Sequence, residues 1–373
     1  MMPKKIKILI VGMYDNPGGI ENMIFNYVSH IKSDKFDFAF LNVYEKMCYQ
    51  DDFEKMGYKV FTLINPQKKP FEFFAEFLKL CENENFDIIH INMLSAANTL
   101  PLLAAKISGN KKIIFHSHNG NTVGFHRHIL HFCGKFFVNI LTDYKFACSN
   151  AAAKFMFGGD YLQNVKIINN AIDTSKFKFD ENFRKKIRKE LNVLPNDFLI
   201  GHIGRFEAQK NHSFLIKIFK KVSEKLPNAK LILVGAGYAM DEAKKLAEDL
   251  NISDKIIFYG KSDKTFEIYS ALDLFLFPSL FEGLPLVGIE AQCNGLPILA
   301  STGISKEMQI TDLVSWSSLT ENEDVWAKKV INILQNSAQK DCLEQIENAG
   351  YSIEKEAIKL EKIYCEIAER KLK

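Results

Sequence analysis

The sequence predicts an α/β protein built from two doubly wound parallel sheets. Short apolar, β-branched segments alternate with amphipathic segments of helix length through most of the 373 residues. This alternation is typical of chains of βαβ units. It occurs in two successive series, each about the size of one domain. Hydrophobic residues make up 47% of the chain and charged residues 25%, which is enough apolar material for two buried cores.

The first series contains five expected strands, and the second contains five more. In the first, the strands are expected at residues 6–12, 36–43, 87–91, 112–116 and 144–148, with helices at 22–31, 71–81 and 96–107. In the second, strands are expected at 198–203, 230–234, 255–259, 272–277 and 296–300, with helices at 213–225 and 241–250.

The change from one series to the next falls near residues 175–195, which predicts domains at 1–178 and 179–352. The turn-rich residues 169–173 and the highly charged residues 179–190 that follow them are interpreted as a linker. The last 50 residues predict helices at 323–335, 340–348 and 353–371, with no strand of their own.

Composition excludes several classes of protein. The net charge is only +3, far from the balance of a dedicated nucleic-acid binder. Seven scattered cysteines without a Cys-x-x-Cys pair argue against a disulfide framework or a zinc ribbon, and favour a reducing cytoplasm. The chain has no apolar run of about 18 residues and no signal-peptide pattern at its start, so we expect neither secretion nor a membrane span.

The charge is unevenly distributed. Residues 1–179 carry +5 and the remainder −2, and residues 106–154 alone carry +6. Phenylalanines and aliphatic residues lie between these cations, so residues 125–140 are expected to rest on an anionic membrane surface without crossing it. The alternative is an ordinary amphipathic helix packed on its own sheet.

Glycines follow the first expected strand. Gly18 and Gly19 precede Glu21 and a helix, so backbone amides there are available to an anion. A tight turn without a ligand is the other interpretation, because the G-x-G-x-x-G pattern is absent. Gly235 and Gly237 lack the third glycine of that pattern and are interpreted as a turn, and no P-loop pattern occurs.

The most informative stretch follows the strand expected at 272–277. Glu282 lies in a loop, Pro285 marks the start of a helix, and Glu290 lies inside that apolar helix. A buried carboxylate needs a hydrogen-bonding partner, such as a ligand hydroxyl, or else backbone amides or a lysine.

Two cations follow the strand expected at 198–203. Arg205 and Lys210 lie in one loop, with Asn211 expected to cap the next helix. Open α/β sheets bind ligands at the carboxyl ends of their strands, so these cations form a candidate clamp for a diphosphate. A solvated charged loop is the alternative.

Histidines follow the strand expected at 112–116. His116 and His118 have no cysteine or carboxylate at ligand spacing, so no metal site is expected there. His126, His128 and His131 do not share one helix face and are expected to be solvated or lipid-facing.

Together these residues resemble glycosyltransferase family 4, retaining nucleotide-sugar enzymes of the GT-B type with two Rossmann-like domains facing a cleft. The shared features are the Gly-Gly-x-Glu loop, His116, the Arg205–Lys210 loop, and two glutamates with seven residues between them. The subgroup to which the chain looks most similar synthesises bacterial capsules and exopolysaccharides. One departure is Ala171, where the family usually has glycine.

The resemblance implies a role for each residue. The catalytic residues would be His116, Glu282, Arg205 and Lys210. Donor binding would involve Gly18, Gly19, Arg205, Lys210, Glu282, Gly283, Leu284, Pro285 and Glu290, with Glu290 holding the ribose. Glu21 and His118 would lie on the acceptor side. The first domain would bind the acceptor, the second the donor, and the helix 353–371 would cross back onto the first.

The implied reaction moves a hexose or N-acetylhexosamine from a nucleoside-diphosphate sugar, expected to be a UDP-sugar, to a growing lipid-linked glycan. No cofactor is expected, and the absence of Asp-x-Asp favours a metal-independent enzyme, located in the cytoplasm or on the inner membrane face. Two alternatives stay open: a sugar-nucleotide epimerase of the same fold, and a non-catalytic glycan-binding subunit.

Overall fold

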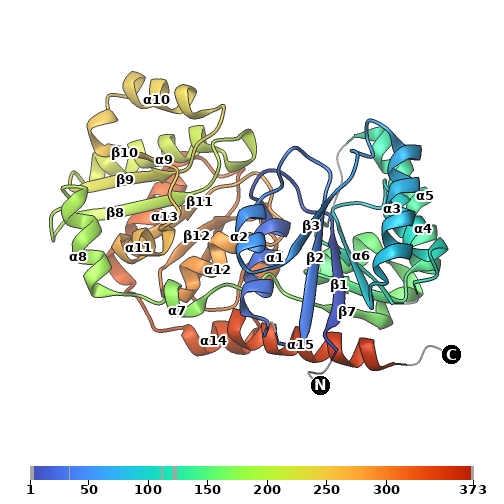
Figure 1. Ribbon diagram of the computed structural model, residues 1–373. Coiled ribbons are helices and arrows are strands. Elements are labelled where there is room, and N and C mark those ends of the chain that lie inside the picture. The colour runs from blue at the N-terminus through green and yellow to red at the C-terminus, as the bar shows by residue number, and fades with distance from the viewer. Residues whose placement is uncertain (1–3, 33, 111, 121–123, 371–373) are drawn as a thin grey trace. The chain divides into compact units, whose positions relative to one another are not determined.

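The computed structural model describes residues 4–32, 34–110, 112–120 and 124–370. The chain divides into two compact units, Met1–Ala171 with Ile353–Lys373, and Ile172–Ser352 (Figure 1). Each unit is a parallel sheet covered by helices on both faces, which confirms the predicted fold class of two Rossmann-like domains.

The sheet of the first unit has seven parallel strands in the order β3-β2-β1-β4-β5-β6-β7. The strands are β1 (Ile6–Val11), β2 (Phe36–Asn42), β3 (Lys59–Thr62), β4 (Ile88–Met93), β5 (Ile113–Ser117), β6 (Tyr144–Ala147) and β7 (Val165–Ile167). The chain reverses its direction of travel across the sheet between β1 and β4. Doubly wound folds bind ligands at this switch point.

The helices of the first unit form two layers. One layer holds α1 (Gly19–His30), α2 (Gln50–Lys55) and α15 (Ile353–Glu369); the other holds α3 (Pro70–Glu84), α4 (Leu100–Ile107), α5 (Phe125–Leu141) and α6 (Asn150–Met156). Alternate residues of each strand feed these two cores: Ile8 and Ile10 pack on the first layer, Leu9 and Val11 on the second.

The sheet of the second unit has six parallel strands in the order β10-β9-β8-β11-β12-β13. They are β8 (Phe198–Ile203), β9 (Ala229–Val234), β10 (Ile256–Gly260), β11 (Leu274–Phe277), β12 (Ile298–Ser301) and β13 (Val314–Ser317). The switch point here lies between β8 and β11.

The second unit's helices also form two layers. One holds α7 (Thr174–Phe177), α8 (Glu181–Glu190), α11 (Thr265–Ala271), α12 (Leu286–Cys293) and α14 (Leu343–Asn348); the other holds α9 (His212–Lys225), α10 (Met240–Asp249) and α13 (Glu323–Asn336). No helix in the described part of the chain is long and apolar enough to cross a bilayer.

Residues 179–190 were expected to form the second part of a linker, and for these residues the expectation is wrong. The segment forms α8, because Asp180 caps it by accepting hydrogen bonds from the amides of Asn182 and Phe183. Arg184 and Arg188 each pair with Asp273, at 2.6 and 3.1 Å. The charges therefore attach the helix to its own sheet.

Three strands were not predicted: β3, β7 and β13. Each has three or four residues, and each lies at an edge of its sheet. The helix expected at 96–107 begins only at Leu100, whose amide donates to the Asn98 side chain in a preceding turn. The end of the helix expected at 353–371 lies outside the described residues, as does Lys111 of the basic segment.

Candidate functional site

The cationic loop and the glutamate loop of the second unit leave the sheet on the two sides of its switch point. Arg205 and Lys210 follow β8, whereas Glu282 and Glu290 follow β11, and these two strands are hydrogen-bonded neighbours. Sequence periodicity predicted the strands but not their adjacency. The switch point therefore gathers two loops that are about 70 residues apart in the sequence.

Lys210 and Glu282 form a shielded ion pair. The Lys210 Nζ lies 2.7 Å from Glu282 Oε1, and the two side chains are only 16% and 10% exposed. Gln209 Nε2 donates to the other carboxylate oxygen at 3.1 Å. A carboxylate oxygen can accept more than one hydrogen bond, so Glu282 keeps the capacity to accept from a ligand while Lys210 is held in place.

The backbone of Glu282 is fixed by a segment that the sequence did not single out. Glu282 bridges Ile304, and its carbonyl accepts from the amide of Ser305 at 3.0 Å. Gly303 makes this approach possible, because a Cβ there would lie 2.2 Å from the carbonyl oxygen of Leu280. The signal was present in the sequence as a glycine two residues after a strand.

Arg205 lies at the surface, in contrast to Lys210. Its side chain is 75% exposed and its guanidinium lies 3.1 Å from Glu207. The neighbouring Phe206 is fully buried and anchors the loop. Gly235, which has a φ of 143°, lets the next loop approach, because a Cβ there would lie 2.0 Å from the Gly204 carbonyl. The Gly235 turn predicted from the sequence thus supports the cationic loop.

Asn211 occupies the N-cap position of α9, but its side chain does not cap the helix. Its amide nitrogen donates instead to the carbonyl of Pro278, 3.2 Å away. The Asn211 backbone is left-handed, with a φ of 58°, which asparagine tolerates better than most residues. The predicted N-cap position is confirmed, but the Asn211 side chain joins the two loops of the switch point and makes no capping bond to the helix.

The start of α12 lies beside Glu282. Pro285 is the N-cap, and no side chain caps this end. Gly283 is exposed, and Leu284 is half-buried. The amides of the first turn therefore add a partial positive charge to the switch point.

Glu290 lies on α12 and accepts a hydrogen bond from Tyr269 Oη at 2.9 Å. Burial raises the pKa of Glu290 to about 7, and the Tyr269 hydrogen bond opposes that rise. The partner expected from the sequence was a ligand hydroxyl, backbone amides or a lysine, and Tyr269 was missed. Tyrosine in a helix carries no signal that it would reach a carboxylate 21 residues later.

In the first unit, the glycine loop follows β1 at the corresponding switch point. Gly18 is the N-cap of α1, and a Cβ there would lie 2.8 Å from Glu21 Oε2. Glu21 is 3% exposed, and its carboxylate accepts from the amide of Tyr14 at 3.0 Å. Burial raises the pKa of Glu21. Glu21 therefore shapes its own loop, while Gly19 stays exposed.

His116 and His118 lie at the carboxyl end of β5, with their ring centroids 4.1 Å apart. His116 Nδ1 lies 3.2 Å from His90 Nε2, and His118 Nε2 lies 2.9 Å from Asn92 Oδ1. Burial lowers the pKa of His118 to about 3 and that of His116 well below its usual range. Both rings are therefore neutral at physiological pH.

Sequence analysis selected His116 and His118 as candidate site residues but did not identify their partners His90 and Asn92. These partners lie on β4, two residues apart and on one face of the strand. A hollow opens at the same edge of the sheet, lined by Gly12, Tyr14, Tyr44, Asn98 and ten further residues from strands β1, β2 and β4, helices α3 and α4, and the loops after β1, β2 and β3. The first unit therefore places neutral histidines and a hollow at the carboxyl edge of one sheet.

Ala171, the departure from the family pattern, does not require a glycine. It is fully buried, and it is absent from the residues with positive φ. Its carbonyl accepts from Asn26 Nδ2 at 3.2 Å. The backbone at this position is thus compatible with any small residue.

Helix α5 exposes an apolar stripe. Only His131, Gly134 and Val138 are buried on this helix, whereas the exposed large side chains are Phe125, Ile129, Leu130, Phe132, Phe136, Phe137 and Ile140. His131 was expected to be solvated or lipid-facing, and this was wrong: its Nδ1 accepts from the amide of Ala96 at 3.0 Å. The helix packs on its unit by a narrow strip and turns most of its apolar surface outward.

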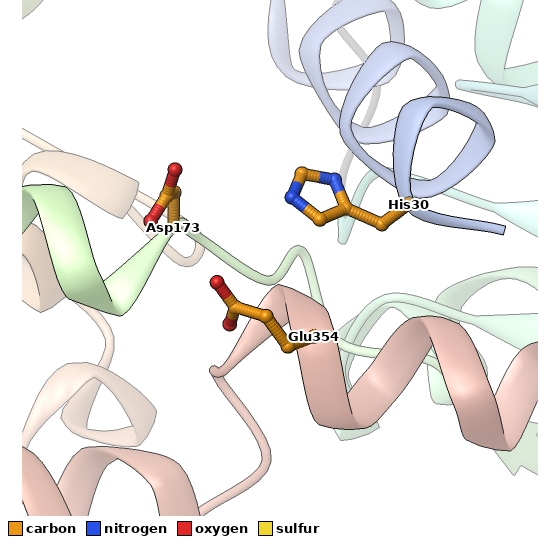
Figure 2. Close-up of side chains that lie close together, drawn as sticks. All are labelled: His30, Asp173 and Glu354. Carbon is orange, nitrogen blue, oxygen red and sulfur yellow. The ribbon is translucent and has the colours of Figure 1, made fainter.

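Figure 2 shows three side chains that carry metal-ligand atoms. His30 projects from the last turn of α1, and Glu354 from the first turn of α15, both in the first unit. Asp173 caps α7 in the second unit, by accepting from Lys176 N and Ser175 Oγ. His30 Nδ1 has its own partner, the carbonyl of Asn26 at 2.8 Å. Asp173 and His30 are therefore satisfied within their own units.

Comparison with known proteins shows which families this chain matches. Residues 17–176 match the family described as Glycosyltransferase Family 4, and residues 183–351 match Glycosyl transferases group 1. The putative glycosyltransferase EpsF of Bacillus subtilis is 28% identical over 338 residues, which cover 88% of this chain and 87% of that protein.

A second relative is the UDP-Gal:alpha-D-GlcNAc-diphosphoundecaprenol alpha-1,3-galactosyltransferase of Escherichia coli. It is 26% identical over 314 residues, which cover 79% of each chain. The crystal structure of Anabaena HepE in complex with UDP-glucose has the same fold, with a TM-score of 0.76 at 19% identity over 97% of this chain and 98% of that one. The chain thus belongs to the GT-B glycosyltransferases, with a Glycosyltransferase Family 4 region followed by a Glycosyl transferases group 1 region.

Proposed function

We propose that this glycosyltransferase moves a hexose or N-acetylhexosamine from a UDP-sugar to a lipid-linked glycan during exopolysaccharide or capsule synthesis, with retention of the anomeric configuration. The observation that carries the proposal is the switch point of the second unit. There, the cations of one loop and Glu282 of the other lie at the carboxyl ends of neighbouring strands, and Glu290 lies on the helix that follows the second loop. Membership of a glycosyltransferase family favours transfer over the epimerase and non-catalytic alternatives.

The second unit is the proposed donor site. Lys210 and Arg205 would hold the diphosphate, and fixed cations of this kind stabilise the charge that develops on a leaving phosphate. Glu282 would accept from the sugar. The backbone of Gly283, Leu284 and Pro285 would approach sugar or phosphate, with the N–H groups of Gly283, Leu284 and the first turn of α12 as donors, since Pro285 has no N–H. Glu290 would accept from the ribose hydroxyls.

The first unit is the proposed acceptor side. His116 would contact the transferred sugar, with His118 and the Glu21 loop toward the acceptor, and Gly18 and Gly19 would let a phosphate approach the start of α1. The names of relatives support the substrate classes. HepE is described as a complex with UDP-glucose, and the Escherichia coli relative is named for UDP-Gal and a diphosphoundecaprenol-linked acceptor.

The proposed transfer breaks the bond between the anomeric carbon and the phosphate oxygen, and forms a bond from that carbon to the acceptor oxygen on the same face. The acceptor's proton passes to the departing phosphate oxygen, so the nucleoside diphosphate leaves with that proton. Lys210, held by Glu282, would neutralise the phosphate as the bond breaks.

Metal independence is part of the proposal. The diphosphate carries negative charge that other enzymes neutralise with a divalent cation. Lys210 and Arg205 supply two positive charges in one loop, and the uncapped start of α12 adds a partial charge. These groups would do the work of a metal ion.

Helix α5 is the proposed contact with an anionic membrane, on the inner face of a cytoplasmic membrane. Its exposed residues Phe125, Ile129, Phe132, Phe136 and Ile140 follow one another at helical spacing, so they form a continuous stripe. Arg127 and Lys154 are exposed nearby in the sequence. An apolar stripe beside cations suits a bilayer interface with acidic headgroups, where a lipid-linked acceptor would be found.

A panel of nucleotide sugars tests this function. The purified protein is incubated with each donor, and slow donor hydrolysis and thermal shift are recorded. We expect a UDP-sugar to raise the melting temperature and to be hydrolysed, and an added undecaprenyl-diphosphate-linked sugar to receive the hexose as an α-linked product. Stabilisation by no member of the panel, or a product with inverted anomeric configuration, would contradict the proposal.

A further inference from the structure

A chain of buried hydrogen bonds connects the terminal helix to the histidine at the end of β5. Tyr364 Oη on α15 lies 2.7 Å from His90 Nδ1, and His90 Nε2 lies 3.2 Å from His116 Nδ1. All three side chains are at most 3% exposed. Tyr364 itself is wedged against Phe36 and Phe38, so the position of its hydroxyl is well defined.

Which group donates in each of these hydrogen bonds follows from the number of protons that each side chain carries. Burial lowers the pKa of His90 to about 3 and raises that of Tyr364, so His90 is neutral and Tyr364 keeps its proton. Within the described residues Tyr364 has no second hydrogen-bond partner, and a buried hydroxyl proton left unpaired is costly. Tyr364 therefore donates to His90 Nδ1, and the single proton of His90 lies on Nε2.

His90 Nε2–H then donates to His116 Nδ1. A neutral imidazole carries one proton, so that of His116 lies on Nε2. This atom is buried and has no hydrogen-bond partner among the described residues. His116 is consequently oriented and protonated as a hydrogen-bond donor that still lacks an acceptor.

His118 offers a hydrogen-bond acceptor, whereas His116 offers a donor. The Asn92 amide nitrogen donates to the carbonyls of Val11 and His90, so its Oδ1 faces His118 Nε2 and accepts the proton there. His118 Nδ1 is left as a bare acceptor, and it too is buried, with no partner in the part of the chain that the structure describes. The adjacent rings thus offer one donor and one acceptor, which is the complement of a hydroxyl group.

We propose that Tyr364 and His90 are positioning residues that hold His116 in its Nε2–H tautomer, and that His116 and His118 together recognise one sugar hydroxyl. This inference rests on the proposed function, because it takes the ligand to be the sugar of the substrate. It gives the terminal helix a part in substrate recognition as well as in packing.

The tautomers are measured directly by two-bond ¹H–¹⁵N correlation spectra of the full chain labelled at histidine. The signals of His116 are assigned by their loss in His116→Gln and by contacts between its ring protons and Phe146, which lies edge-on to it. We expect protonated Nε2 and bare Nδ1 for both His116 and His118. A proton on His116 Nδ1 would overturn the proposal, and this result needs no assay of activity.

Tyr364→Phe removes only the donating hydroxyl. We expect the Nδ1–H form of His116 to become populated and kcat to fall on the order of fivefold, the effect of one hydrogen bond. The matched control is Tyr27→Phe, because Tyr27 is 2% exposed in the same core and donates to the carbonyl of Asn169 at 2.7 Å. It should change neither quantity.

An unchanged His116 spectrum in Tyr364→Phe, or the same change in Tyr27→Phe, would refute the role of Tyr364. If instead the wild-type chain turned over no nucleotide sugar, the proposed function would fail while the tautomer assignment could still be correct. The two failures are therefore distinguishable.

Discussion

The two units share a strand order around their switch points but surround these points with different chemistry. In the second unit the loops carry the charged residues Arg205, Lys210 and Glu282, and Glu290 lies on the helix α12 that follows. In the first, the strand ends carry histidines that burial keeps neutral. Fixed charges suit a diphosphate, whereas neutral donors and acceptors suit hydroxyl groups. The comparison teaches that two copies of one architecture can divide a substrate by the residues placed at their strand ends.

The largest expected effect comes from removing the shielded cation. Lys210→Ala should lower kcat by about a hundredfold to a thousandfold, as the loss of a group that stabilises developing charge does. The control is Lys217→Ala, on the exposed side of α9, which should leave turnover unchanged. Circular dichroism checks that both variants fold. Wild-type turnover by Lys210→Ala would show that the charged residues of the second unit do not have the proposed role in turnover.

The next largest effect is expected from the exposed apolar stripe of α5 in the first unit. The double variant Phe132→Ser/Phe136→Ser should bind vesicles containing anionic lipid at least about tenfold more weakly, because each buried phenylalanine contributes about 1.5–3 kcal/mol. Its control is Phe71→Ser, since Phe71 is also exposed in the same unit, at 88% against 79% for Phe132 and 65% for Phe136, but lies outside the stripe. Co-sedimentation measures the partition. Equal binding by both variants, or binding that ignores anionic lipid, would contradict the membrane proposal.

A smaller effect concerns the pH dependence of donor binding. The pKa of Glu290 is about 7, and only its ionised form accepts hydrogen bonds from the ribose with both oxygens. The KM for the donor should therefore rise about tenfold as the pH falls from 8 to 6.

The matched variant is Glu290→Gln, which cannot ionise. Its KM should be higher than that of the wild type at pH 8 and should lack the tenfold rise. A parallel pH profile for the two proteins would show that another group titrates.

The last prediction is that removing or adding divalent metal ions has no effect on the rate. Because Lys210, Arg205 and the start of α12 supply the positive charge, EDTA should leave initial rates unchanged. Added Mg²⁺ or Mn²⁺ should not raise them. Loss of activity in EDTA and its recovery with either metal would contradict the metal-independent part of the proposal.

Much of the fold could be predicted from the sequence, because parallel strands buried on both faces are continuous apolar runs. The short edge strands β3, β7 and β13 could not, since three or four residues leave little periodicity. The charged segment 179–190 misled for a related reason. Its two arginines donate to Asp273 and to the carbonyls of Ser270 and Ala271 at the end of α11. Composition alone does not distinguish such a helix from a linker.

The positions of the candidate site residues were predictable where they lie close to predicted elements in the sequence. Arg205, Lys210 and Glu282 follow predicted strands and Glu290 lies in a predicted helix, and the two cations in one loop indicated a diphosphate. The supporting residues depend on distant parts of the chain. Tyr269 reaches Glu290 across 21 positions and Tyr364 reaches His90 across 274, and no local pattern records such contacts.

The division of labour between the units is tested most directly by calorimetric titration with UDP and with the UDP-sugar that the donor panel identifies. Lys210→Ala should weaken the binding of both ligands by similar factors, since both carry the diphosphate. His116→Gln should leave UDP affinity within about twofold of the wild type and weaken only the sugar nucleotide, by about one hydrogen bond. If His116→Gln weakens UDP as much as Lys210→Ala does, or if Lys210→Ala leaves UDP binding unchanged, the two units do not divide the substrate in this way.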